Sequence, residues 1–136
     1  MLFRSSVTGS DNVGGLIGGF GPTSAGFTPV LANSYATGAV ALSSGATGTY
    51  LGAVGGAIRG SFSALFFDSS TTGQSDSNAT AKTTAQMQGT AASGNLQSID
   101  LGTAFRLVTG DYPLLCKYGA PAYCPSDSDL VGGQLN

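Results

Sequence analysis

The sequence predicts an all-β fold, a short β-solenoid of glycine-rich repeats with a small helix and strand cap. The 22 glycines among 136 residues are interleaved with Val, Ile, Leu and Phe and follow no Gly-X-Y register, which excludes collagen and argues against simple disorder. All seven acidic residues are Asp and only five residues are Lys or Arg, so charged helix formers are scarce. Two motifs also recur in the same order, as expected of stacked coils.

Two short motifs carry the repeat. A polar stretch ending in glycine, SSVTG at residues 5–9, recurs as SYATG at residues 34–38, and a looser copy, LFFDSSTTG, spans residues 65–73. A glycine-rich stretch, VGGLIG at residues 13–18, recurs as VGGAIR at residues 54–59. These pairs predict offsets of 29 and 41 residues between successive coils.

A solenoid gives this density of glycine a structural reason. Each strand pairs with its copies in the neighbouring coils, so inward side chains form apolar ladders and glycines occupy tight corners. We expect Val13, Leu16, Val54 and Ile58 to point inward. A lone glycine-rich hairpin or loop is the alternative, because short apolar runs between glycines are ambiguous. The expected repeat-motif residues are Val13, Gly14, Gly15, Leu16, Gly18, Val54, Gly55 and Gly56.

The segment after the repeats predicts a cap over the last coil. Thr83 or Thr84 is suited to be the N-cap of a short helix that runs to Gln88, with Met87 facing inward. A closing strand is expected from Val108 to Leu115, where a proline restricts it to a sheet edge. The predicted organisation is therefore solenoid repeats over residues 1–76, the cap over 77–115, and a disulfide loop with a polar tail over 116–136.

The two motifs together resemble a known family. Val13–Gly18 followed by Asn33–Gly38 resembles the GLUG repeat, named for Gly-Leu-any-Gly, of large bacterial surface proteins related to filamentous haemagglutinin adhesins. The second copy, Gly56-Ala57-Ile58-Arg59, departs from that motif at the Leu and at the last Gly. Leu65–Gln88 and Ala104–Leu115 are similar to the block that closes such arrays. The resemblance covers residues 3 to 115 and implies the C-terminal end of a repeat array in an extracellular or cell-surface, adhesin-type module.

Several functional classes find no support in the composition. Without histidine a Ser-His-Asp arrangement is impossible, and Asp68 and Asp76 lie in a Ser/Thr-rich loop where Asp is typical of turns, so we expect no enzyme. A net charge of −2 without clustered Lys or Arg predicts no nucleic-acid partner. No apolar stretch reaches the roughly 18 residues of a membrane span. No cofactor or metal is expected, with weak calcium binding by Asp127 and Asp129 as an alternative.

The expected function is non-enzymatic binding to a protein or glycan on a host or neighbouring cell. The candidate contact face consists of Thr8, Tyr35, Thr37, Tyr118 and Tyr123.

Two alternatives are retained. In the first, the chain is a structural subunit of an extracellular filament. It would self-associate through its N-terminal coil, residues 1 to 20, because that coil has no cap, begins as if in mid-repeat and follows no recognisable secretory signal. In the second, the chain binds ice or a carbohydrate surface through rows of threonine at Thr8, Thr37 and Thr72.

Cys116 and Cys124 frame the segment KYGAPAY, in which Gly119 and Pro121 can turn the chain. In an exported protein a disulfide is the expected state of such a pair. A metal site is the weaker reading, because the chain has no histidine and no third cysteine to complete tetrahedral ligation.

We expect Cys116 and Cys124 to be oxidised to each other in protein from its native compartment. The closed loop would contribute at most about 2–3 kcal/mol by constraining the unfolded chain. Mass spectrometry before and after reduction should differ by two hydrogens. Alkylation of both thiols without prior reduction would contradict the disulfide and remove the main argument for an extracellular address.

Overall fold

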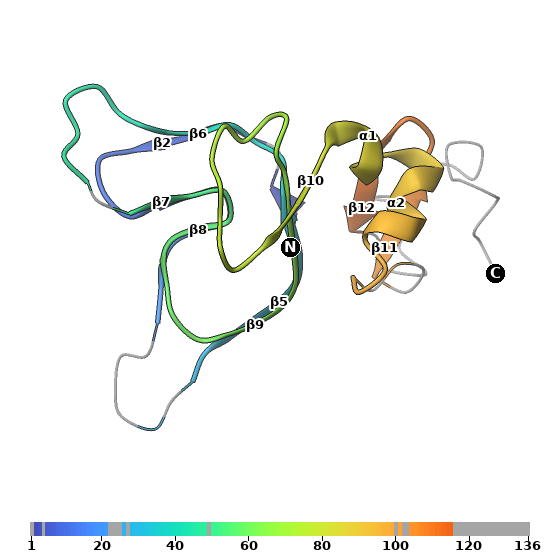
Figure 1. Cartoon of the computed structure of the whole chain (residues 1–136), viewed down its shortest axis with the longest axis horizontal. Helices are drawn as coiled ribbons and strands as arrows, with labels where there is room; N and C mark the ends of the chain where they lie inside the picture. Colours follow the sequence, from blue (N-terminus) through green and yellow to red (C-terminus); the bar gives the residue numbers. More distant parts are fainter. Residues whose placement is uncertain are drawn as a thin grey trace. The chain divides into compact units, whose positions relative to one another are not determined.

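The computed structural model describes residues 2–3, 5–21, 26, 28–48, 50–99, 101 and 104–115. Most of its regular structure is β, which confirms the predicted all-β class (Figure 1). The chain forms two compact units, Met1–Lys82 and Thr83–Asn136. The first unit extends beyond the expected boundary at residue 76, because Thr80–Lys82 still pairs with a strand of that unit.

The first unit is built from short strands joined by tight corners. Its described strands are β1 (Leu2–Phe3), β2 (Val7–Gly9), β3 (Val13–Gly14), β4 (Ile17–Phe20), β5 (Val30–Ala36), β6 (Val40–Leu42), β7 (Leu51–Gly52), β8 (Gly55–Ile58), β9 (Ser61–Asp68) and β10 (Thr80–Lys82). We call β1–β4 the first pass of the chain, β5–β8 the second pass, and β9 with residues 69–79 the third pass. Figure 1 shows the second pass following the path of the first.

Every strand pair described in the first unit is parallel and joins one pass to the next. One sheet has four strands in the order β1-β5-β9-β10, and three smaller sheets pair β2 with β6, β3 with β7, and β4 with β8. Each strand therefore continues the hydrogen bonding of the corresponding strand in the preceding pass. Figure 1 shows β5 and β9 side by side along one wall of the unit.

The observed register corrects the two offsets expected from the motifs. Val13 lies opposite Leu51, 38 residues later, and not opposite Val54. The backbones pack closely in this register, since a Cβ on Gly14 would come within 2.5 Å of the Cα of Gly55. The register also stacks Phe20 on Ile58, whereas an offset of 41 would place Phe20 opposite Ser61.

The polar motif is also shifted from its expected partner. Gly9 lies opposite Leu42 and not opposite Gly38, because Val7 pairs with Val40, 33 residues later. The looser third copy begins opposite the second, with Ser34 opposite Leu65 at an offset of 31, whereas the two Thr-Gly endings are 35 residues apart. The second and third polar stretches therefore pair with each other, but the spacing between the Thr-Gly endings does not give the register.

Two stacked residues with positive φ change which face of the four-stranded sheet points inward. Asn33 and Ala64 both have φ of 50°, and the pairing of β5 with β9 skips this position. Non-glycine residues rarely adopt this conformation. Strict alternation is broken here, so Leu31 before the kink and Ala36 and Phe67 after it all pack in one core.

The core of the first unit lies inside the loop that each pass describes. Its buried members are Ala36, Ala53, Val54, Leu65 and Phe67, with Leu16, Leu31, Phe62 and Ala79 packed around them. Val13 and Val54 are buried, as predicted. Leu16 packs against the core while half-buried, and Ile58 is also half-buried.

The second unit contains two short helices and a hairpin. They are α1 (Thr84–Met87), α2 (Gly89–Asn95), β11 (Phe105–Val108) and β12 (Asp111–Leu115). Thr83 is the N-cap of α1, its N–H donates to Gln86 Oε1 at 2.9 Å, and Met87 is fully buried, which confirms the predicted helix. The expected single strand from Val108 is wrong, because Gly110 turns the chain with φ of 70° and the two strands pair antiparallel.

Truncation of Phe67 to Ala should lower the free energy of unfolding by about 3–5 kcal/mol, because the ring is buried in the core of the first unit. Phe62→Ala provides the matched control, since Phe62 packs on the edge of the same core and is half-buried, with an expected loss of about 1–2 kcal/mol. Urea unfolding followed by circular dichroism measures both. Equal midpoints for the two variants would show that Phe67 does not lie in the core.

Candidate functional site

The candidate site lies where the third pass crosses the edge of the second pass. Residues 69–79 run beside β6, β7 and the start of β8, and they pair with these strands irregularly. Val40 N–H donates to the Thr72 carbonyl at 2.9 Å, and the Val40 carbonyl accepts from Gln74 Nε2 at 3.1 Å. Ala53 N–H donates to the Ser75 carbonyl at 3.2 Å. This segment thus covers much of the strand edge that the second pass presents.

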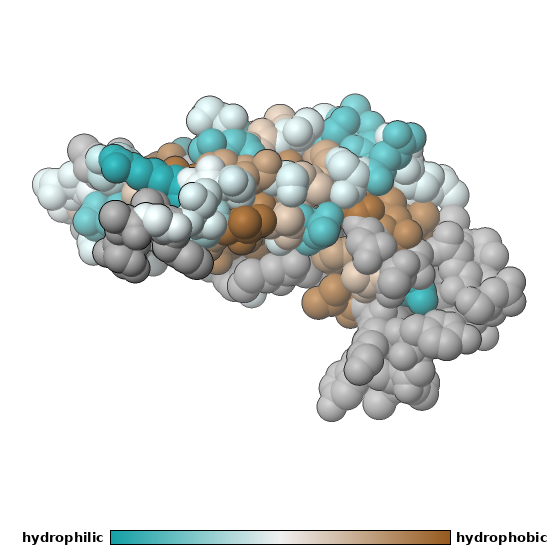
Figure 2. Space-filling model, turned by 90° about the horizontal axis from the view of Figure 1, so that it is seen from below, coloured by the Kyte–Doolittle hydropathy of each residue, from teal (hydrophilic) through white to brown (hydrophobic). Residues whose placement is uncertain are grey.

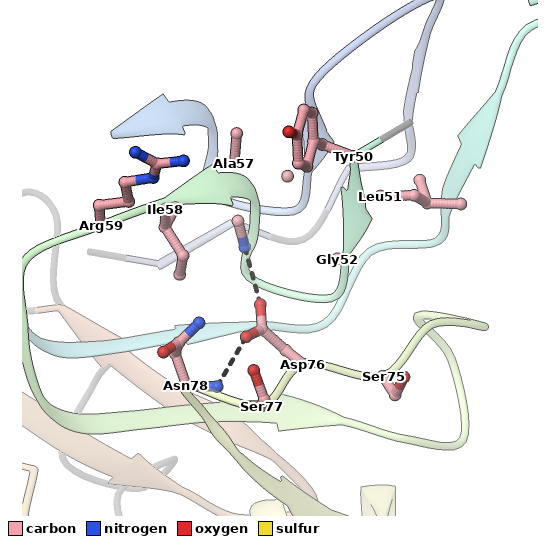
Figure 3. Close-up of a pocket in the computed structure, with 12 residues that line it drawn as sticks. Tyr50, Leu51, Gly52, Ala57, Ile58, Arg59, Ser75, Asp76, Ser77 and Asn78 are labelled. Atoms are coloured by element: carbon pink, nitrogen blue, oxygen red, sulfur yellow. Dashed lines mark hydrogen bonds between the residues drawn. The ribbon is translucent and has the colours of Figure 1, made fainter. Parts of the chain in front are cut away.

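Asp76 completes this covering with its side chain. Its Oδ2 accepts hydrogen bonds from the N–H groups of Val54 at 3.1 Å and Gly55 at 3.0 Å, the second of which Figure 3 shows. Its Oδ1 accepts from Asn78 N–H at 2.9 Å, which forms a local turn. The carboxylate replaces the carbonyls that a further strand would offer to the start of β8. Three donors on one half-buried carboxylate also fix its position.

Beyond Asp76 the third pass leaves the second and runs to β10. As a result β8 is the last strand of the β4-β8 sheet. A pocket of about 590 Å³ occupies the space beside it. The pocket is lined by Tyr50, Leu51, Gly52, Gly55, Gly56, Ala57, Ile58, Arg59, Ser75, Asp76, Ser77 and Asn78.

The walls of this pocket differ in character on the two sides of β8. In Figure 3, Ala57, Arg59 and Tyr50 lie on one side of the strand, and Ile58 points to the other side, where Asn78 lies. Tyr50 is 51% exposed, and Arg59 and Asn78 are exposed. Three side-chain groups of the pocket have no hydrogen-bond partner within the described part of the chain. They are the Tyr50 hydroxyl, the Arg59 guanidinium and the side-chain amide of Asn78.

These free groups suit recognition of a ligand by hydrogen bonding and charge. A guanidinium is permanently charged and offers a fork of donors that matches a carboxylate. Asp76 is engaged by three backbone donors. Among the described residues, no group of three or more His, Cys, Asp and Glu side chains is arranged to hold a metal ion.

A second, more polar groove lies at another corner of the first unit. Its volume is about 480 Å³, and it is lined by Ser10, Asp11, Gly45, Ala46, Thr47 and Gly48. The Gly48 N–H donates to the Ser10 carbonyl at 3.1 Å, so the corner of the second pass lies on that of the first. On the face that Figure 2 shows, patches of strongly hydrophilic residues lie among residues of intermediate hydropathy and groups of hydrophobic ones.

The structure brings few members of the expected contact face together. Thr8 is exposed on β2, but Tyr35 is fully buried and Thr37 is 6% exposed, so their assignment to a contact face is wrong. The kink at Asn33 turns Tyr35 to the sheet face opposite the core, where it is buried all the same. Tyr118 and Tyr123 lie outside the described residues, as do Cys116, Cys124, Asp127 and Asp129.

A surface row of threonines is also excluded. Thr72 is 1% exposed, because its hydroxyl donates to the Asp68 carbonyl at 2.8 Å inside the corner. Asp68 itself is buried and accepts from Ser70 N–H at 2.7 Å, as expected of a turn-forming Asp. Thr72 and Asp68 therefore hold a corner of the chain together and do not form an outer surface.

Sequence reasoning missed the residues that line the pocket, apart from the repeat glycines Gly55 and Gly56. Asp76 was expected only to form a turn, and its bonds to the second pass depend on a register that the motifs do not reveal. Arg59 ends the second glycine-rich stretch and Tyr50 precedes it by four residues, and this nearness is the signal that could have directed attention to them.

The chain matches no model of a protein family, no curated protein and no solved structure. The likeness to GLUG repeats therefore remains a prediction from the motifs. Among the helices of the described residues, none has the length and apolar character needed to cross a membrane.

Asp76→Ala should lower the free energy of unfolding by about 1.5–3 kcal/mol, because the backbone N–H groups of Val54 and Gly55 lose a charged acceptor. Amide exchange at Val54 and Gly55 should accelerate relative to the rest of the core. Asp11→Ala is the control, since Asp11 is exposed and, among the described residues, its side chain bonds only to neighbouring Asn12, with an expected loss of about 0.5 kcal/mol or less. Unchanged exchange at Val54 and Gly55 would show that Asp76 does not hold this edge.

Proposed function

We propose that the chain is a non-enzymatic, adhesin-type binding module of an extracellular or cell-surface bacterial protein, built as a short β-solenoid. The main support is the parallel pairing of strands in every described sheet of the first unit. Stacked passes of this kind produce a stiff scaffold whose corners carry variable surface residues. The motifs that resemble GLUG repeats lie within these passes.

The solenoid proposal is supported by how like residues stack. Val7 lies on Val40, Gly14 on Gly52, and Tyr35 on Phe66. Stacking of similar side chains along an axis is the feature that distinguishes a solenoid from a collection of hairpins. Parallel pairing has the same implication, because a hairpin pairs its two strands antiparallel.

Binding is favoured over catalysis by the chemistry of the pocket. Its free side chains are a phenol, a guanidinium and a primary amide, which are suited to recognition. Histidine, the usual general base near neutral pH, is absent from the chain. Proposed partners are therefore surface molecules of a host or neighbouring cell, met in the extracellular space.

A second candidate is self-association through the N-terminal coil. Strands β1, β2, β3 and β4 each stand at one end of their sheets, so this pass presents an open strand edge among the described residues. The opposite edge is covered at Val40, Ala53 and Val54 by the third pass. An N-terminal edge that is open throughout and an opposite edge that is partly covered favour pairing of two N-terminal edges over an open-ended filament.

The proposed function predicts that beads coated with the purified chain adhere to cells. Beads should be retained on epithelial or bacterial cell layers several-fold more than beads coated with an unrelated acidic protein of similar size. Soluble chain should compete with the beads, because adhesion depends on saturable contacts. Retention equal to that of the control beads on all layers would contradict an adhesin-type function.

A further inference from the structure

The pocket beside β8 occupies the place of a missing strand. In the large sheet, the third pass adds a full strand, β9, to β5. At β8 it adds only the Asp76 carboxylate and then turns away at Asn78. The edge of β8 from Gly56 to Ile58 therefore borders a hollow instead of another strand (Figure 3).

The floor of the hollow carries no large side chain. Gly52, Gly55, Gly56 and Ala57 form much of its lining, and none of them has a side chain beyond Cβ that would cover the edge of β8. The edge itself offers backbone groups that an added strand can pair with.

The two walls suit the side chains of an extended peptide. Successive residues of a strand point to opposite sides, so a strand laid along β8 would direct them alternately toward Arg59 and Tyr50 and toward Asn78. Arg59 is exposed and has no acidic partner within the described residues. A carboxylate on the incoming strand would supply that partner with bidentate geometry.

We propose that this pocket binds an extended peptide segment with an Asp or Glu side chain, which adds to β8 as the third strand of the β4-β8 sheet. The proposal rests on the proposed binding function and specifies its partner as a polypeptide. A strand edge at the floor favours a peptide over a saccharide, because a peptide backbone can match its donors and acceptors in sequence.

The test is selection of displayed random peptides of about ten residues, enough for a typical strand, on the full 136-residue chain. The enriched sequences should contain Asp or Glu. As synthetic peptides, they should shift the backbone amide signals of Gly56, Ala57 and Ile58 in nuclear magnetic resonance spectra. Methylation of alternate backbone nitrogens in the peptide should weaken binding by about tenfold or more, since it removes strand hydrogen bonds.

Three variants locate the binding and its charge. Ser77→Trp fills the hollow and Arg59→Glu reverses its charge, so each should weaken peptide binding by about tenfold or more. Arg59→Lys should keep part of the affinity. Thr47→Trp is the matched control, because it places the same large ring at an exposed position in the other groove and should leave binding unchanged.

Three results would overturn the inference. They are no enrichment of peptides, equal binding by the Ser77→Trp variant, or insensitivity to backbone methylation. Binding of an acidic oligosaccharide such as trigalacturonic acid in the same pocket, without peptide binding, would assign the site to another ligand class. Beads that adhere to cells equally with and without Ser77→Trp would contradict the pocket while leaving the adhesin-type function intact. Peptide binding without cell adhesion would support the peptide pocket and contradict the adhesin-type function.

Discussion

Contact between the backbones of the two glycine-rich stretches is the constraint on which the first unit depends. A Cβ on Gly14 would come within 2.5 Å of the Cα of Gly55, and one on Gly56 within 2.6 Å of the Val13 nitrogen. Hard-sphere contacts of this kind admit no side chain at these points. The close approach fixes the register of β3 on β7 and of β4 on β8, and through it the place of every later corner. The density of glycine in the sequence is therefore a packing requirement.

Features that depend on neighbouring residues could be predicted from the sequence. The all-β class followed from composition, and the helix after Thr83 followed from capping signals, with Met87 buried as expected. The register could not be derived by matching identical letters, because NVGGLIGGF lies on YLGAVGGAI, where Val13 meets Leu51. The glycine pairs pointed to an offset of 41, since Gly14 and Gly15 match Gly55 and Gly56, whereas the structure has an offset of 38. The left-handed conformation of Ala64 had no sequence signal. The burial of Tyr35 and Thr37, which follow the kink at Asn33, was misjudged.

The pocket was beyond sequence reasoning for a different reason. It exists because the third pass is shorter than the second and leaves β8 without a neighbour. Neither Asp76 nor Tyr50 is unusual within its own local sequence. What gives them a role is a contact between residues more than twenty positions apart, which depends on the lengths of intervening corners. The Ser/Thr-rich sequence around Asp76 predicted a turn there. Its hydrogen bonds to Val54 and Gly55 depend on how the third pass lies along the second.

The corners between strands differ in length without disturbing the strands they join. Three residues, 10–12, connect β2 to β3, whereas eight, 43–50, connect β6 to β7, and the strands on both sides of these corners still pair in order. Length variation is therefore confined to the outside of the stack. Insertions and deletions in such corners are close to neutral for folding, so they can accumulate during divergence. A lineage built on this scaffold can change its outer surface by altering loop length while the glycine positions inside remain fixed.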